Sequence, residues 1–133
     1  MVDLPGAAEL FDRVLDVWRG GDPRRIRDLV TDDYQGHMLH LADGERSADS
    51  YAEWIARYQR NNPGCTFEVR SQAVVGDRLW TRLDARLPDG RVAHGMNTST
   101  IRDGLLAEEW AIWSGWFEAD PAGPCDHQPF CSG

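Results

Sequence analysis

The sequence contains no lysine, and all 14 of its basic residues are arginine. The absence excludes mechanisms in which a lysine amine forms a Schiff base with a carbonyl substrate. Acidic residues outnumber basic ones by 22 to 14, which gives a net charge of -8. Because nucleic-acid binding depends on clustered positive charge, we expect no nucleic-acid partner.

Long apolar runs are also missing. No run of the sequence approaches the roughly 20 apolar residues that are needed to cross a bilayer. The first residues have neither the basic region nor the apolar stretch of a signal peptide. We therefore expect a cytoplasmic protein without membrane contact.

Cysteine is scarce, and Cys65, Cys125 and Cys131 are scattered. An odd number of distant thiols does not form a disulfide framework. The spacing of Cys125, His127 and Cys131 matches no standard zinc pattern, and the chain has no glycine-rich phosphate loop, so we expect neither metal nor cofactor. We expect one domain over residues 1–119 and an irregular tail over residues 120–133.

Helical signals occupy the first half of the chain. Apolar residues recur at three- and four-residue steps over residues 7–18, which predicts an amphipathic helix. The pair Asp22-Pro23 predicts the start of a short second helix. Residues 34–41 have the pattern of a strand, and a third helix is expected between Ser47 and Asn61.

Strand signals dominate the second half. Residues 65–117 read as four strands joined by turns at Gly76-Asp77, Pro88-Asp89-Gly90 and Asp103-Gly104. Sequential strands with such short connections predict an antiparallel meander. Helices followed by a meander indicate an α+β domain in which the helices cover one face of the sheet.

Turn lengths also predict which side chains share a face. Loops of two, three and two residues place Asp84 opposite His94 and Thr98 opposite Glu109. On this register the face toward the helices carries Phe67, Val69, Ser71, Ala73, Val75, Trp80, Arg82, Asp84, His94, Met96, Thr98, Glu109, Ala111 and Trp113. Charged groups on a mostly apolar face shift each other's pKa values, as a catalytic pocket requires.

Each of these charged residues has a second interpretation. Arg82 and Asp84 are either a structural ion pair or part of the site. His94 is either a satisfied buried histidine or a general base held by Asp84. Glu109 lies on the surface if the register slips by one, since Glu108 stands beside it.

The order and spacing of several short motifs resemble the SnoaL-like branch of the nuclear-transport-factor-2-like superfamily over residues 7–117. The motifs are Trp18-Arg19-Gly20-Gly21-Asp22, Thr31-Asp32-Asp33-Tyr34 with His37, Gly76-Asp77-Arg78-Leu79 with Arg82, and Arg102-Asp103-Gly104 with Glu108-Glu109-Trp110. The resemblance implies a cone-shaped fold, with a strongly curved antiparallel sheet wrapped around the N-terminal helices and an internal pocket. It also implies a homodimer.

Members of this family act as polyketide cyclases, isomerases or epoxide-opening enzymes, and others only bind. Aldol-type cyclases of the family usually carry Asp directly after the Trp of the final strand, where this sequence has Ala111; the later acidic position is Ser114. Arg82-Leu83-Asp84 is similar to the Arg-x-Asp motif of limonene-epoxide-hydrolase-like enzymes. The second Asp of those enzymes also falls at Ala111, and Glu109 is the candidate substitute.

We therefore predict a cofactor-independent acid/base enzyme that acts on a small apolar polyketide, aromatic or isoprenoid metabolite by cyclisation, isomerisation or epoxide opening. Asp84 and His94 are the predicted base pair, Glu109 the acid, and Arg82 the group that stabilises negative charge. The predicted substrate-binding residues are Tyr34, His37, Tyr51, Trp54, Tyr58, Trp80, Met96, Thr98 and Trp113. The alternative, favoured by Ala111, is a non-catalytic binding or scaffold protein.

Overall fold

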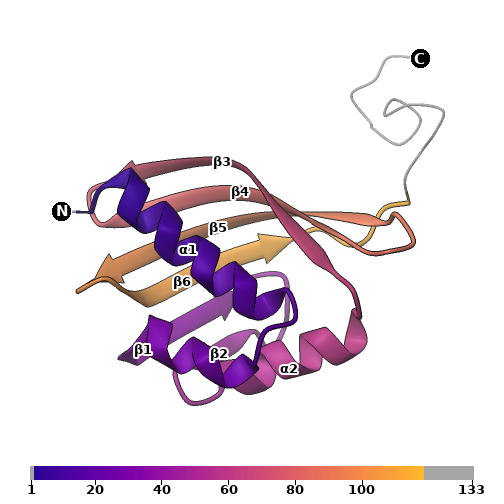
Figure 1. Cartoon of the computed structure of the whole chain (residues 1–133), viewed down its shortest axis with the longest axis horizontal. Helices are drawn as coiled ribbons and strands as arrows, with labels where there is room; N and C mark the ends of the chain where they lie inside the picture. The colour runs from indigo at the N-terminus through magenta and orange to yellow at the C-terminus, as the bar shows by residue number, and fades with distance from the viewer. Residues whose placement is uncertain (1, 119–133) are drawn as a thin grey trace.

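The computed structural model describes residues 2–118, which form a six-stranded sheet with helices on one face (Figure 1). The predicted tail, including Cys125, His127 and Cys131, lies outside the described residues. The elements in chain order are α1 (Leu4–Trp18), η1 (Pro23–Leu29), β1 (Val30–Met38), β2 (Glu45–Ser47), α2 (Tyr51–Asn61), β3 (Thr66–Val75), β4 (Arg78–Arg86), β5 (Val92–Arg102) and β6 (Leu105–Trp113).

Helix α1 begins where the sequence supplies a cap. The Asp3 side chain accepts a hydrogen bond from the Gly6 backbone N–H at 2.7 Å, which satisfies one free donor of the first turn. The apolar stripe then faces the sheet and buries Ala7, Leu10, Phe11, Val14, Leu15 and Val17. The chain leaves the helix through Gly20, whose φ of 114° favours glycine.

The sheet has the strand order β2-β1-β6-β5-β4-β3. Strands β3 to β6 form the predicted antiparallel meander, which confirms the α+β fold class. The first strand joins it parallel to β6, so the sheet is mixed rather than purely antiparallel. The short strand β2 was not predicted, because its three residues are too few to show an alternating pattern.

Two β-bulges change the predicted register. The β4–β5 pairing is as expected, with Asp84 opposite His94. In the β5–β6 pair, an irregularity between Thr100 and Ile101 places Ser99, and not Thr98, opposite Glu109. An extra residue in one strand turns the side chains beyond it to the other face. Glu109 therefore shares its face with Ser99, away from Asp84 and His94.

The second bulge, in β3, explains why the inner face was assigned wrongly. Phe67 and Val69 pack toward the helices as predicted, but the register shifts between Val69 and Ser71. Beyond the shift, Ser71, Ala73 and Val75 are exposed on the outer face, so their predicted inward placement is wrong. The β4 residues that face the helices are Leu79, Thr81, Leu83 and Ala85, all buried. Trp80, Arg82, Asp84, His94, Met96 and Thr98 lie on the opposite, convex face. Their predicted inward placement is wrong.

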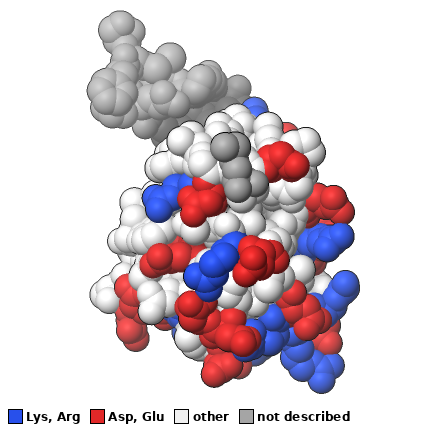
Figure 2. All heavy atoms as spheres, turned by 90° about the vertical axis from the view of Figure 1, so that its left-hand side faces the viewer, with Lys and Arg blue, Asp and Glu red and all other residues white. Residues whose placement is uncertain are grey.

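Charges of both signs are distributed over the surface. At the end of the molecule where α1 begins, arginine and acidic side chains are interspersed and do not form a single basic patch (Figure 2). Exposed ion pairs such as Arg13–Glu9 and Arg102–Asp33 are examples of this mixing. No helix among residues 2–118 is long and apolar enough to cross a membrane.

Candidate functional site

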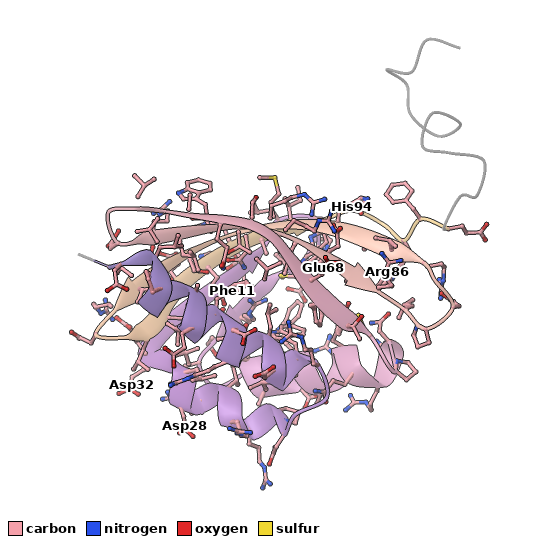
Figure 3. All side chains as sticks on the ribbon, turned by 45° about the horizontal axis from the view of Figure 1, so that its top comes forward. Phe11, Asp28, Asp32, Glu68, Arg86 and His94 are labelled. Carbon is pink, nitrogen blue, oxygen red and sulfur yellow. The ribbon has the colours of Figure 1, made fainter. Side chains whose placement is uncertain are left out.

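A cavity of about 260 Å³ lies between the helices and the concave face of the sheet. Phe11 points into it from α1, whereas His94 stands on the far side of the sheet (Figure 3). Most of the lining is apolar or aromatic, as is usual for small-molecule sites. The lining residues are Phe11, Val14, Leu15, Trp18, Met38, His40, Leu41, Arg46, Tyr51, Trp54, Tyr58, Phe67, Leu83, Ala93, Asn97, Glu109, Ala111, Trp113, Ser114 and Trp116.

Glu109 is the one carboxylate that lines this cavity within residues 2–118, and it is only 1% exposed. Its Oε1 atom accepts hydrogen bonds from the Tyr34 hydroxyl at 2.7 Å and from the Tyr51 hydroxyl at 3.3 Å. Arg46 Nη2 lies 3.5 Å from the same oxygen. Burial, with the nearby Glu109 charge, raises the pKa of both tyrosines, so both hydroxyls donate as neutral groups.

The second carboxylate oxygen of Glu109, Oε2, has fewer hydrogen-bond donors around it than Oε1. Asn97 Nδ2 donates to Oε2 at 3.1 Å. The Ser99 hydroxyl lies 3.2 Å from Oε2 but only 2.6 Å from Asn97 Oδ1. A hydroxyl has one hydrogen, so Ser99 donates to one of these two acceptors at a time. Oε2 is consequently the oxygen of Glu109 that has more capacity to accept a further hydrogen.

Arg46 reaches the cavity from β2, in which it is buried between two exposed neighbours. Its Nε donates to the Tyr34 hydroxyl at 3.1 Å, and its Cζ lies 4.3 Å from the centre of the Tyr51 ring, a cation–π distance. Burial lowers the pKa of Arg46, but Tyr51, Tyr34 and Glu109 outweigh it and raise the value, so the guanidinium is charged. Its Nη1 atom is enclosed and has no hydrogen-bond partner among the described residues.

His40 lies at the edge of the cavity, on the loop after β1. Its Nδ1 accepts a hydrogen bond from the Trp113 backbone N–H at 3.2 Å. Burial lowers the pKa of His40, which favours the neutral ring. A neutral ring that accepts at Nδ1 carries its proton on Nε2, so His40 is a hydrogen-bond donor there.

The predicted cluster of Arg82, Asp84 and His94 exists, but it does not share a pocket with Glu109. His94 Nδ1 and Arg82 Nη1 both lie 2.7 Å from Asp84 Oδ1. Burial raises the pKa of Asp84, but these two partners outweigh it and hold the value below its ordinary range. The His94 side chain is 50% exposed, as expected on an open convex surface.

Only some of the predicted substrate-binding residues line the cavity. The cavity wall contains Tyr51, Trp54, Tyr58 and Trp113. Tyr34 lies behind Glu109, outside the lining. His37 contacts Glu45 and Glu108 and stacks on Trp110, away from the cavity. The placement of Trp80, Met96 and Thr98 in the pocket is wrong, because the bulges leave them on the convex face.

Sequence reasoning missed Arg46, Asn97 and His40. Arg46 stands on a strand too short to be recognised, and Asn97 was on the outward side of the predicted register. No local sequence signal marks Arg46 as buried. Its strand partner Gly36 makes room for it, because a Cβ at Gly36 would lie 2.6 Å from both Arg46 Nε and the Tyr34 hydroxyl. No group of three or more His, Cys, Asp or Glu side chains within residues 2–118 forms a metal-ligand set.

Residues 11–109 match the SnoaL-like domain family, and the chain belongs to that family. A comparison with curated proteins found no match. IdmH from Streptomyces antibioticus, a candidate polyketide cyclase, is 22% identical with a TM-score of 0.70, over 80% of this chain and 90% of that one. A candidate ketosteroid isomerase from Kribbella flavida is 15% identical with a TM-score of 0.70, over 88% and 84%. These likenesses show the shared fold.

Proposed function

We propose that this protein is a cofactor-independent acid/base enzyme whose reactive group is Glu109, acting on a small, largely apolar metabolite held in the cavity. The observation that carries the proposal is the pairing of Arg46 Nη2 with Glu109 Oε1 at 3.5 Å, both side chains being 2% exposed. This pair stands in the wall of an otherwise mainly apolar and aromatic cavity.

A buried ion pair is weak evidence for stability, because desolvation of both charges opposes their attraction. Well-packed apolar side chains of similar volume often stabilise a core at least as well. Charged groups gathered in a cavity wall are, in contrast, typical of functional sites. We therefore attribute the pair to ligand chemistry rather than to folding.

The hydrogen bonds assign a role to each carboxylate oxygen. Three donors hold Oε1, while Oε2 accepts from Asn97 and competes with Asn97 Oδ1 for the Ser99 proton. In the proposed reaction, Oε2 accepts a proton from a carbon next to a substrate carbonyl, and the electrons of the broken C–H bond move to the carbonyl oxygen. Donors that are already oriented stabilise such an enolate without reorganisation. Return of the proton from Glu109 to another carbon of the conjugated enolate gives isomerisation. Attack of the enolate carbon on a second carbonyl, whose oxygen then takes the proton from Glu109, gives cyclisation.

Epoxide opening receives less support from the geometry. The motif that suggested it, Arg82-Leu83-Asp84, places both charged side chains on the convex face and not in the cavity. The proposal therefore covers cyclisation and isomerisation.

The test is a product screen with a matched pair of variants. The purified protein is incubated in ¹⁸O-labelled water with enones, aromatic polyketides and epoxides, and products are identified by mass spectrometry. A new product of unchanged mass is expected from at least one carbonyl compound. Glu109→Gln should reduce its formation by about 10²-fold or more, the usual range for an acid/base group. Glu108→Gln, which changes the neighbouring carboxylate bonded to His37, should leave the rate unchanged. Equal rates in both variants would contradict the role of Glu109.

A second candidate function is ligand binding without catalysis. It is favoured by the five side chains within hydrogen-bonding distance of Glu109, because a carboxylate so engaged has to give up or share a hydrogen bond in order to accept a proton. In this case, compounds of the panel would raise the melting temperature while none is converted. Glu109→Gln would then alter affinity alone.

A further inference from the structure

Two side chains of the cavity wall each have a hydrogen-bond donor that lacks an acceptor among the described residues. Arg46 Nη1 is enclosed and has no partner. Asn97 Nδ2 carries two N–H groups, of which one donates to Glu109 Oε2, and no described residue accepts from the other. Both residues line the cavity and both lie within hydrogen-bonding distance of Glu109, so the two unused donors belong to side chains of one site.

This imbalance is unusual for a buried polar group. Nearly all buried donors in folded proteins are paired, and an unpaired one costs free energy. The other two guanidinium nitrogens each have a partner, since Nε donates to Tyr34 and Nη2 faces Glu109, and Cζ lies over the Tyr51 ring. The structure thus holds Arg46 firmly in place while it leaves one nitrogen without an acceptor.

We infer that the ligand of this cavity carries a neutral carbonyl oxygen, which accepts hydrogen bonds from Arg46 Nη1 and from the Asn97 amide. The inference rests on the proposed use of the cavity for a small molecule, whether or not the molecule is converted. It deepens that proposal because it names the residues that recognise the carbonyl group and requires this group of a ligand that is only bound.

Charge selects a neutral carbonyl over the alternatives. The positive charge of Arg46 is already balanced by Glu109, so a carboxylate ligand would place a second negative charge beside Glu109 in a medium of low dielectric constant. An ammonium ligand would add donors to a site that already has two unused ones. A carbonyl oxygen supplies two lone pairs and no net charge.

The position of Nη1 adds one requirement. Because this atom is enclosed, a ligand oxygen reaches it only when the guanidinium or a bordering side chain shifts. On the other side, Gly36 leaves no room for Arg46 to retreat, since even a Cβ there would lie 2.8 Å from Arg46 Cγ. The expected movement is therefore toward the cavity.

A series of bicyclic probes of similar size tests the inference on the full chain. The probes are 1-tetralone (a ketone), tetralin (the hydrocarbon) and 1-aminotetralin (an ammonium ion), with binding measured by calorimetry. We expect the ketone to bind about tenfold more tightly than the hydrocarbon, which corresponds to about 1.4 kcal/mol, and the ammonium ion to bind most weakly. Arg46→Met, which keeps an unbranched apolar stem and removes the donors, should make ketone and hydrocarbon affinities equal. Arg86→Met, at an exposed position of β4, should preserve the difference.

The outcomes separate this inference from the proposed function. Equal binding of ketone and hydrocarbon to the unaltered protein would overturn the carbonyl preference and leave the cavity as a binding site. A preference that survives Arg46→Met would overturn the role of Arg46. Absence of binding by every probe would contradict the inference and the proposed function together. The comparison of probes needs no variant, so it remains decisive if Arg46→Met fails to fold.

Discussion

Gly36 and Arg46 are direct partners in the β1–β2 pair, and the Arg46 side chain passes over the Gly36 backbone so closely that a Cβ would lie 2.6 Å from Arg46 Nε. The same Cβ would lie 2.6 Å from the Tyr34 hydroxyl. Glycine at this position thus creates the space in which the guanidinium and the tyrosine both reach Glu109. The charged site depends on a residue that contributes no side chain.

Gly36→Ala should therefore damage the site through packing alone. The added methyl group has to displace Arg46 or Tyr34, and overpacking of this kind typically costs about 1–3 kcal/mol of unfolding free energy. Urea denaturation measures the loss, and calorimetry with a bound ketone measures the accompanying loss of affinity. Gly115→Ala is the matched control, because a Cβ at Gly115 meets nothing within 4 Å. Equal stability of the two variants would show that Arg46 does not need the space.

Asp84 allows a prediction about pH. Burial raises the pKa of its carboxyl, but the contacts with His94 and Arg82 outweigh burial, so the folded-state value is below the ordinary 3.8. A lowered carboxyl pKa stabilises the folded state above the ordinary value, and this contribution disappears as the pH falls through the lowered one. Asp84→Asn should thus cost about 1 kcal/mol or less at pH 7, since the partners are partly exposed, and progressively less below about pH 4.

Urea denaturation of the unaltered protein and of Asp84→Asn at pH 7 and at pH 3 measures this dependence. Asp43→Asn, at an exposed position of the loop before β2, is the control and should show no such change. Product formation should not respond to Asp84→Asn, because Asp84 stands on the face of the sheet opposite the cavity. A large loss of turnover would restore Asp84 as a candidate for catalysis.

The fold could be predicted from the sequence because its signals are local and repeated. The stripe on α1, the three tight turns and the alternation within each strand are each specified by neighbouring residues. The site was harder to predict than the fold, because it depends on which face of the sheet each residue occupies. A single bulge between Thr100 and Ile101 moves Glu109 to the face opposite Asp84, and nothing in the local sequence marks it clearly.

Arg46 shows a second reason why the site was harder to predict than the fold. A lone arginine in a short segment has the sequence pattern of a surface residue, because arginine is rarely fully buried. Its burial follows from three distant partners, Tyr34, Tyr51 and Glu109, that come together only in the folded chain. Glu109, in contrast, was placed correctly against the helices because the predicted β6 pattern was right even though its register partner was wrong.

Tryptophan fluorescence should report occupation of the cavity. Four of the six tryptophans line it, namely Trp18, Trp54, Trp113 and Trp116, whereas Trp80 lies on the convex face. Binding of a ketone probe should therefore quench or shift the emission. Trp113→Phe should reduce the change, and Trp80→Phe should preserve it. An undiminished response in Trp113→Phe together with a lost response in Trp80→Phe would place the ligand on the other face.

The homodimer implied by the family resemblance stays a prediction, and the convex face is where we expect the contact. Three large apolar side chains are exposed there on neighbouring strands: Trp80 at 45%, Met96 at 56% and Ile112 at 49%. Exposed apolar groups that cluster in this way often mark an interface. Arg82 and Asp84 beside them carry opposite charges, so a two-fold axis can bring each against the other in a second copy.

Sedimentation of the unaltered protein at several concentrations measures this association. Met96→Arg should shift the equilibrium toward the monomer, because it places a charge in the centre of the apolar cluster and desolvation of an unpaired charge is costly. Leu4→Arg, at another exposed apolar position, on α1, should leave the association unchanged and is the control. A monomer at all concentrations would contradict the homodimer. A dimer that resists Met96→Arg but not Leu4→Arg would instead place the contact at the start of α1.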